Sequence, residues 1–98
     1  MKYGLKETTL LILENFFKKY QFIDKVMIFG SRVRGDYSRS SDIDLCVFSK
    51  NMSSRDFSKL RFEIDELPIL QKIDIIHFEK IDSNLQKNII QYGDYILK

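Results

Sequence analysis

Two aspartates separated by one residue are the most informative feature of the sequence. Asp42 and Asp44 stand at the start of Asp42–Phe48, an apolar run with the composition of a β-strand. Side chains two positions apart leave the same face of a strand, with their Cα atoms ~6.6 Å apart. Neighbouring carboxylates repel one another unless a cation lies between them, so the pair indicates a metal site. Oxygen ligands with no histidine or cysteine nearby favour Mg²⁺, with Mn²⁺ as the alternative.

A glycine and a serine that precede this pair could bind an anion. Gly30 and Ser31 directly follow Lys25–Phe29, a short run rich in strand-forming residues. Glycine lets the backbone turn sharply, and a helical turn starting here would direct N–H groups and the serine hydroxyl at an anion. Arg32 and Arg34 add positive charge beside these donors. We therefore expect all four residues to bind phosphate, although the two arginines could instead be exposed loop cations.

A third carboxylate can be placed by topology. Asp74 lies near the start of a third predicted strand, Ile73–Phe78. If the second strand is antiparallel to the first and parallel to the third, Asp74 reaches the sheet edge that holds Gly30 and Asp42. Three carboxylates at one edge suit two metal ions ~3.5–4 Å apart that assist an in-line displacement at phosphorus. The alternatives are a turn cap for Asp74 and solvent-facing positions for the other two.

Charge argues for a metal-assisted phosphate site rather than a surface that coats nucleic acid. Three arginines and three aspartates cancel between Gly30 and Asp44, and the whole chain carries only +2 from 16 basic and 14 acidic residues. Gly30 and Gly35 have the glycine spacing of a P-loop, but Asp36 and Tyr37 stand where that motif requires Lys and Ser or Thr. We therefore predict neither bulk nucleic-acid binding nor a P-loop.

The elements that must position these residues follow from the hydrophobic periodicity. Helical spacing of apolar residues predicts helices within 5–20, 53–68 and 82–96, with caps at the start of the second and third. Together with the three strands, the order is α, β, a loop or short helix, β, α, β, α. Ninety-eight residues leave room for one domain, 1–98. The predicted fold class is α/β, a three-stranded mixed sheet flanked by helices.

Composition narrows the class of protein further. The chain is 44% apolar and 31% charged, which is typical of a globular domain. The single cysteine, Cys46, cannot form an intramolecular disulfide, and its apolar neighbours predict a buried side chain. Charged residues interrupt the N-terminal apolar run, Leu10–Leu13, too early for a signal peptide or a membrane span. We expect a cytoplasmic protein without a membrane partner.

The combined pattern resembles a known enzyme superfamily. A GS pair, ten residues, DxD and a later Asp resemble the signature of the polymerase-β-like nucleotidyltransferases, and GSRVRG followed by SDIDL resembles their minimal members over nearly the whole chain. The resemblance implies that Gly30 and Ser31 hold a nucleoside triphosphate and that Asp42 and Asp44 bind Mg²⁺. It also implies that Asp74 completes the metal site and helps to deprotonate the attacking hydroxyl.

The resemblance also implies a biological role. Many minimal nucleotidyltransferases are similar to MntA-type antitoxins of HEPN/MNT toxin–antitoxin systems, which implies Mg²⁺-dependent transfer of AMP from ATP to a tyrosine hydroxyl of a HEPN-domain RNase toxin within a hetero-oligomer. His77 stands where family members often carry a second acidic residue outside the shared catalytic set. Two alternatives stay open. One is a non-catalytic module that neutralises its partner by occlusion, and the other is a nucleotidyltransferase that modifies an RNA end or a small molecule.

Overall fold

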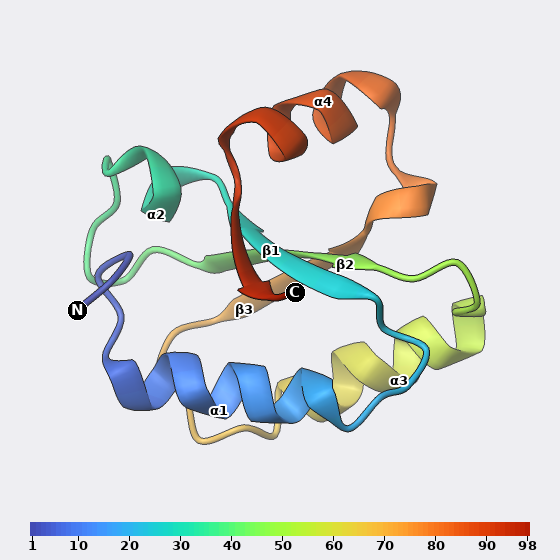
Figure 1. The fold of residues 1–98 in the computed structure, drawn as a ribbon. Coiled ribbons are helices and arrows are strands. Elements are labelled where there is room, and N and C mark those ends of the chain that lie inside the picture. The colour runs from blue at the N-terminus through green and yellow to red at the C-terminus, as the bar shows by residue number, and fades with distance from the viewer.

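A four-stranded mixed sheet with helices on both faces forms the fold (Figure 1). The computed structural model describes all residues, 1–98. Its elements, in chain order, are α1 (Glu7–Lys18), β1 (Lys25–Phe29), α2 (Ser31–Arg34), β2 (Ile43–Phe48), α3 (Ser54–Ile64), β3 (Ile73–His77), the 3₁₀ helix η1 (Phe78–Lys80), α4 (Ser83–Tyr92) and β4 (Asp94–Leu97). The α/β class and the order of α1, β1, α2, β2, α3, β3 and α4 agree with the sequence prediction, which included neither η1 nor β4.

The sheet has the strand order β3-β2-β1-β4. β1 is antiparallel to both β2 and β4, whereas β2 and β3 are parallel. A parallel pair needs a crossover connection, and α3 supplies it between β2 and β3. The directions expected for the first three strands are therefore confirmed.

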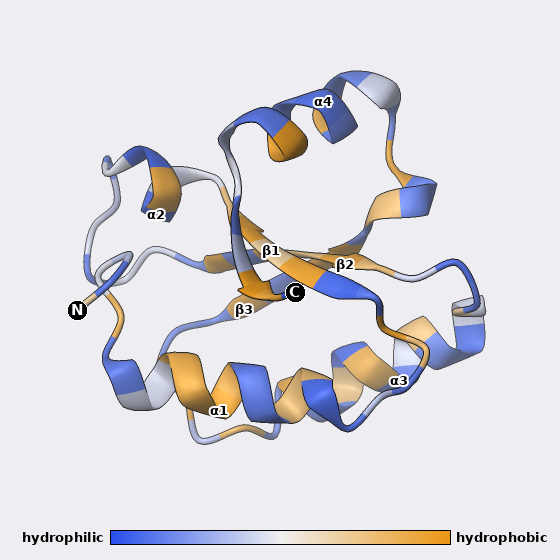
Figure 2. Cartoon of the chain, in the orientation of Figure 1, coloured by the Kyte–Doolittle hydropathy of each residue, from blue (hydrophilic) through white to orange (hydrophobic).

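Two apolar layers hold the helices against the sheet. The larger layer lies between the sheet and the pair α1 and α3 (Figure 1), and both helices carry hydrophobic segments, coloured orange in Figure 2. Leu13 and Phe17 of α1 are fully buried in this layer. The smaller layer lies under α4, where Ile89 packs with Met27 and Phe48, and Phe48 stacks on Phe78 with ring centroids 4.1 Å apart. Burying one such side chain contributes ~1.5–3 kcal/mol, so both layers fix the sheet firmly.

The chain after α4 corrects the sequence prediction. The third long helix was expected to continue as far as Ile96, but α4 ends at Tyr92 and residues 94–97 form β4, so the sheet has four strands rather than three. Gly93 makes this change of direction possible. A Cβ at Gly93 would lie 2.6 Å from the carbonyl oxygen of Ile89, and only glycine lets the chain pass this close.

Helix caps explain where α3 and α4 begin. Ser53 and Asp56 form a reciprocal capping box at the start of α3, in which each side chain accepts from the other's backbone N–H. The Asp82 side chain accepts from the amide of Leu85 at the start of α4. Both caps agree with the sequence prediction. None of the helices has the length and apolar character that crossing a membrane requires.

Candidate active site

The predicted carboxylates lie at one end of the β2–β3 pair. Asp44 of β2 is the register partner of Asp74 on β3 and of Phe29 on β1, so the three residues form one row across the sheet. Asp42 lies two positions earlier, immediately before β2. Ile43 is fully buried on the α1 face, so alternation places the carboxylates on the opposite face, which α4 covers. The structure thus brings the two strand aspartates side by side.

The Gly30–Ser31 turn meets this row at the end of β1. Gly30 has φ +82°, a left-handed conformation that favours glycine, and its carbonyl accepts from the amides of Val33 and Arg34, each at 3.1 Å. A Cβ at Gly30 would lie only 2.7 Å from Oδ2 of Asp44. Glycine therefore allows the backbone of the turn to pack directly against a carboxylate, with Ser31 as the next residue.

Asp42, Asp44 and Asp74 together form what we call the carboxylate row. Electrostatics identify Asp44 as its centre. Burial raises the pKa of Asp44 above its usual range, and the negative charges of Asp74 and Asp42 raise it further, while Arg34 and Arg32 oppose the shift. A cation beside the row would relieve this repulsion. The donor set is made of hard carboxylate oxygens, which suits Mg²⁺ or Mn²⁺. As the side chains stand, no three acidic, histidine or cysteine groups converge closely enough to enclose an ion.

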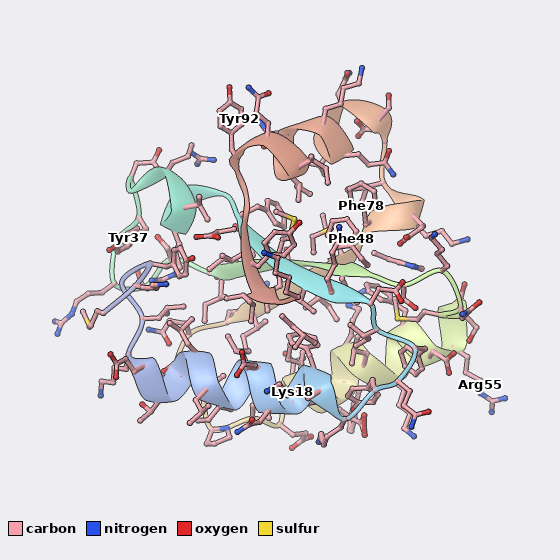
Figure 3. The ribbon with its side chains drawn as sticks, in the orientation of Figure 1. Lys18, Tyr37, Phe48, Arg55, Phe78 and Tyr92 are labelled. Atoms are coloured by element: carbon pink, nitrogen blue, oxygen red, sulfur yellow. The ribbon has the colours of Figure 1, made fainter.

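A pocket of about 230 Å³ adjoins the turn on the α4 side. Its lining combines two aromatic rings, an amide, a guanidinium and the turn itself: Phe29, Gly30, Val33, Arg34, Asn88 and Tyr92. Arg34 is exposed, and its Nε lies 3.3 Å from Oδ2 of Asp36. Sequence reasoning missed Asn88 and Tyr92, because a polar and an aromatic residue on a helix give no signal that the helix covers a site. Tyr92 extends outward from the end of α4 (Figure 3).

Arg32 lies in a different environment from the one predicted. Its side chain is 2% exposed, and its guanidinium donates to backbone carbonyls of Tyr3, Arg39, Ser41 and Asp42. These contacts use four of the five guanidinium N–H groups. Arg32 therefore joins two backbone segments, and the geometry does not present it as a free phosphate ligand beside Ser31.

Two further residues of the sequence analysis are buried, as was predicted for Cys46. His77 is buried on β3, where Nε2 lies 2.8 Å from the carbonyl oxygen of Ser49 and the ring stacks on Phe57. Cys46 is fully buried, and this burial raises the pKa of its thiol to about 12. Neither side chain belongs to the carboxylate row.

The family follows from this arrangement and from comparison with known proteins. Residues 12–98 match the family described as Polymerase beta, Nucleotidyltransferase. The chain belongs to this family of nucleotidyltransferases. The nucleotidyltransferase is 29% identical over 69 residues to a Methanocaldococcus jannaschii protein named "Putative protein adenylyltransferase", a match that covers 69% of this chain and 73% of the relative.

Solved structures share the fold of this nucleotidyltransferase. A toxin–antitoxin complex with AMP-PNP superposes with a TM-score of 0.75 at 16% identity, covering 89% of this chain and 71% of the other. The MNT antitoxin in complex with the tri-AMPylated HEPN toxin of Shewanella oneidensis superposes with a TM-score of 0.62 at 15% identity, covering 89% and 71%. The identities are low, so these likenesses concern the fold.

Proposed function

We propose that this nucleotidyltransferase transfers AMP from ATP to a tyrosine hydroxyl of a HEPN-domain partner protein and thereby acts as its antitoxin. The observation that carries the proposal is the row of Asp44 and Asp74 beside the Gly30 turn. A protein adenylyltransferase among the relatives and an AMPylated toxin in the complex of a structural neighbour support AMP as the group transferred and a protein as the acceptor.

The carboxylate row provides the metal site of the proposed reaction. Asp42, Asp44 and Asp74 would hold Mg²⁺, as two ions, with Mn²⁺ able to replace it. Bound metal would neutralise the triphosphate and stabilise the charge that develops on the attacking and leaving oxygens. Because Asp42 and Asp74 are exposed, their side chains are free to turn toward the half-buried Asp44.

The remaining residues bind and orient the substrates. Gly30 and Ser31 hold the triphosphate, Arg34 adds positive charge, and the adjoining pocket accommodates the nucleoside. Asp74 accepts the proton of the acceptor hydroxyl, whose oxygen forms a bond to the α-phosphorus. The bond from that phosphorus to the oxygen bridging to the β-phosphorus breaks, and pyrophosphate leaves. Positioning and charge neutralisation supply the catalysis.

Transfer of labelled nucleotide tests the proposal. ATP labelled at the α-phosphorus is incubated with Mg²⁺, this protein and the protein encoded by the neighbouring open reading frame, and the label is located by mass spectrometry. We expect label on a tyrosine of the partner and none when ATP is labelled at the γ-phosphorus. Label on RNA or on a small molecule instead would assign a different acceptor.

A double variant separates catalysis from occlusion. Asp42→Asn combined with Asp44→Asn should abolish transfer and also neutralisation of the partner. The matched control is Asp65→Asn, which changes an exposed aspartate at the end of α3 and should leave both unchanged. Neutralisation by a double variant that transfers no nucleotide would support a binding module instead.

A further inference from the structure

All hydrogen bonds of the buried Arg32 guanidinium go to backbone carbonyls. A buried guanidinium needs partners, and no carboxylate forms a salt bridge with this one. Its Nη1 donates to the Tyr3 carbonyl at 2.9 Å, and Nη2 donates to the carbonyls of Ser41 at 2.8 Å and Arg39 at 3.3 Å. Its Nε donates to the carbonyl of Asp42 at 3.3 Å. One side chain thus connects residues 39–42 to the N-terminal turn, residues 2–5.

The N-terminal turn is held in a conformation in which the Tyr3 carbonyl accepts from Arg32. The amide of Leu5 donates to the Lys2 carbonyl at 2.8 Å, and the Leu5 side chain is 1% exposed, so the core anchors the turn. Gly4 has φ +68°, and a Cβ there would lie 2.2 Å from the ring of Tyr37. That ring lies with its centroid 5.1 Å from Cζ of Arg32. Gly4 therefore leaves room for an aromatic cover over the guanidinium.

The loop that leads into β2 has little other support. Within residues 36–42, the other hydrogen bonds are local. Nε of Arg34 donates to Oδ2 of Asp36 at 3.3 Å, and the remaining bonds join serines, such as Ser38 N–H to Oγ of Ser41 at 2.8 Å. Regular pairing resumes only where the amide of Ile43 donates to the Lys72 carbonyl at 2.8 Å. Asp42 is the last residue of this loop and directly precedes β2. Its position beside Asp44 therefore depends on the contacts that Arg32 makes.

We propose that Arg32 is a positioning residue of the active site, which holds Asp42 in place for metal binding through the backbone of residues 39–42. The inference rests on the proposed function, because it concerns the metal site of that reaction. Arg32 does not contact substrate in this role. It connects the N-terminal turn to a carboxylate of the row, so that the turn becomes part of the support of the site.

The geometry makes arginine irreplaceable by lysine. A planar guanidinium presents several N–H groups in fixed directions, whereas a lysine ammonium is a compact charge on a flexible stem and cannot reach carbonyls on two segments together. A phosphate ligand would respond differently, because lysine also binds phosphate as a point charge. Arg32→Lys therefore distinguishes a positioning residue from a phosphate ligand.

The test compares Arg32→Lys with the wild type and with Arg55→Ala, an exposed arginine of α3 at the far end of the molecule (Figure 3). Hydrogen exchange of residues 36–42 and the Mg²⁺ concentration that gives half-maximal thermal stabilisation in the presence of AMP-PNP are measured beside kcat and KM for ATP. For Arg32→Lys we expect faster exchange confined to the loop and a rise of ~10–100-fold in the Mg²⁺ requirement. At saturating Mg²⁺, KM for ATP should stay unchanged.

Two results would overturn the proposal. One is that the amides of residues 36–42 in Arg32→Lys exchange hydrogen at the wild-type rate. The other is that this variant needs the same Mg²⁺ concentration as the wild type for half-maximal thermal stabilisation. Exchange does not depend on catalysis, so this readout holds even if the protein transfers no nucleotide. Tyr37→Ala provides a second variant if Arg32→Lys does not fold, because it removes the aromatic ring over the guanidinium and keeps the hydrogen bonds of Arg32. It should change both readouts in the same direction, by a smaller factor, and Tyr37→Phe should change neither.

Discussion

Asp44 of β2 lies directly opposite Asp74 of β3, as its register partner in the parallel pair. Two carboxylates on one face of neighbouring strands repel each other, and no ion pair with an arginine or lysine compensates either of them. The burial of Asp44 raises its pKa, and the repulsion raises it further. The fold therefore maintains an arrangement that costs stability, and the candidate function gives a reason for it.

Asp44→Asn should make the metal-free protein more stable while removing nucleotide transfer. A pKa that is higher in the folded than in the unfolded state means that ionising Asp44 destabilises the fold. The gain should be nearly absent at pH ~3 and below, where the carboxyl is largely protonated in both states, and should be complete at neutral pH. Because Asp44 is only half-buried, we expect less than ~1 kcal/mol. Thermal melting at pH ~3 and pH ~7 measures it, and equal gains at the two pH values would contradict this cause.

Binding of metal and nucleotide to the folded state should raise the free energy of unfolding of the wild-type protein. With Mg²⁺ and AMP-PNP at ~100 times the dissociation constant, the expected gain is ~2.7 kcal/mol. EDTA should remove the gain, and Mn²⁺ should restore it. The variant with both Asp42→Asn and Asp44→Asn should show no gain in differential scanning fluorimetry, whereas Asp65→Asn should respond as the wild type does.

Gly30→Ala should inactivate the enzyme, and Gly35 offers a matched control. Both glycines have positive φ, +82° and +91°, so alanine at either position should cost ~1–2 kcal/mol of stability. A Cβ at Gly30 would meet Oδ2 of Asp44 at 2.7 Å, whereas a Cβ at Gly35 would have no atom within 4 Å. We expect transfer to fall by ~10-fold or more only in Gly30→Ala, because a displacement of ~1 Å at a reacting centre can cost 10²-fold.

Removing the capping box should weaken the fold without affecting the site. Ser53→Ala deletes the acceptor of the Asp56 amide at the start of α3, which should cost ~1 kcal/mol. Urea denaturation followed by circular dichroism measures this change. The value of kcat should stay at the wild-type level, since α3 covers the sheet face opposite the carboxylates.

The thiol of Cys46 should be inert in the folded protein. Burial raises its pKa to about 12, so almost no thiolate exists at pH 8. A disulfide reagent such as DTNB should leave native protein unmodified for hours and react with one equivalent after unfolding in guanidinium chloride. Rapid reaction under native conditions would mean that β2 opens locally far more often than a central strand should.

Local patterns predicted much of the fold and the candidate site. The run Lys25–Phe29 is observed as β1 without change, and the spacing of Asp42 and Asp44 gave the correct face of β2. The Ser53 cap was also correct. Each of these features is encoded within a few neighbouring residues. The placement of Asp74 needed only one further step, because the length of the connection indicated a parallel crossover.

Features that depend on distant segments could not be predicted in this way. β4 is a four-residue edge strand, and its pairing with β1 is visible only when residues some 70 positions apart meet. The acceptors of Arg32 belong to the N-terminal turn and to residues 39–42, so its position beside Ser31 suggested a phosphate ligand. Asn88 reaches the pocket only because α4 crosses that face of the sheet.

The central position of β1 has a consequence for how the chain folds. β1 pairs with β2 on one edge and with β4 on the other, and β4 consists of residues 94–97. Contacts over such long separations form late, because a large loop must close before they contribute. A folding intermediate without β4 would expose a hydrogen-bonding edge of β1 that can pair with other chains. Substitutions in β4 should therefore promote aggregation during synthesis even where the folded enzyme tolerates them.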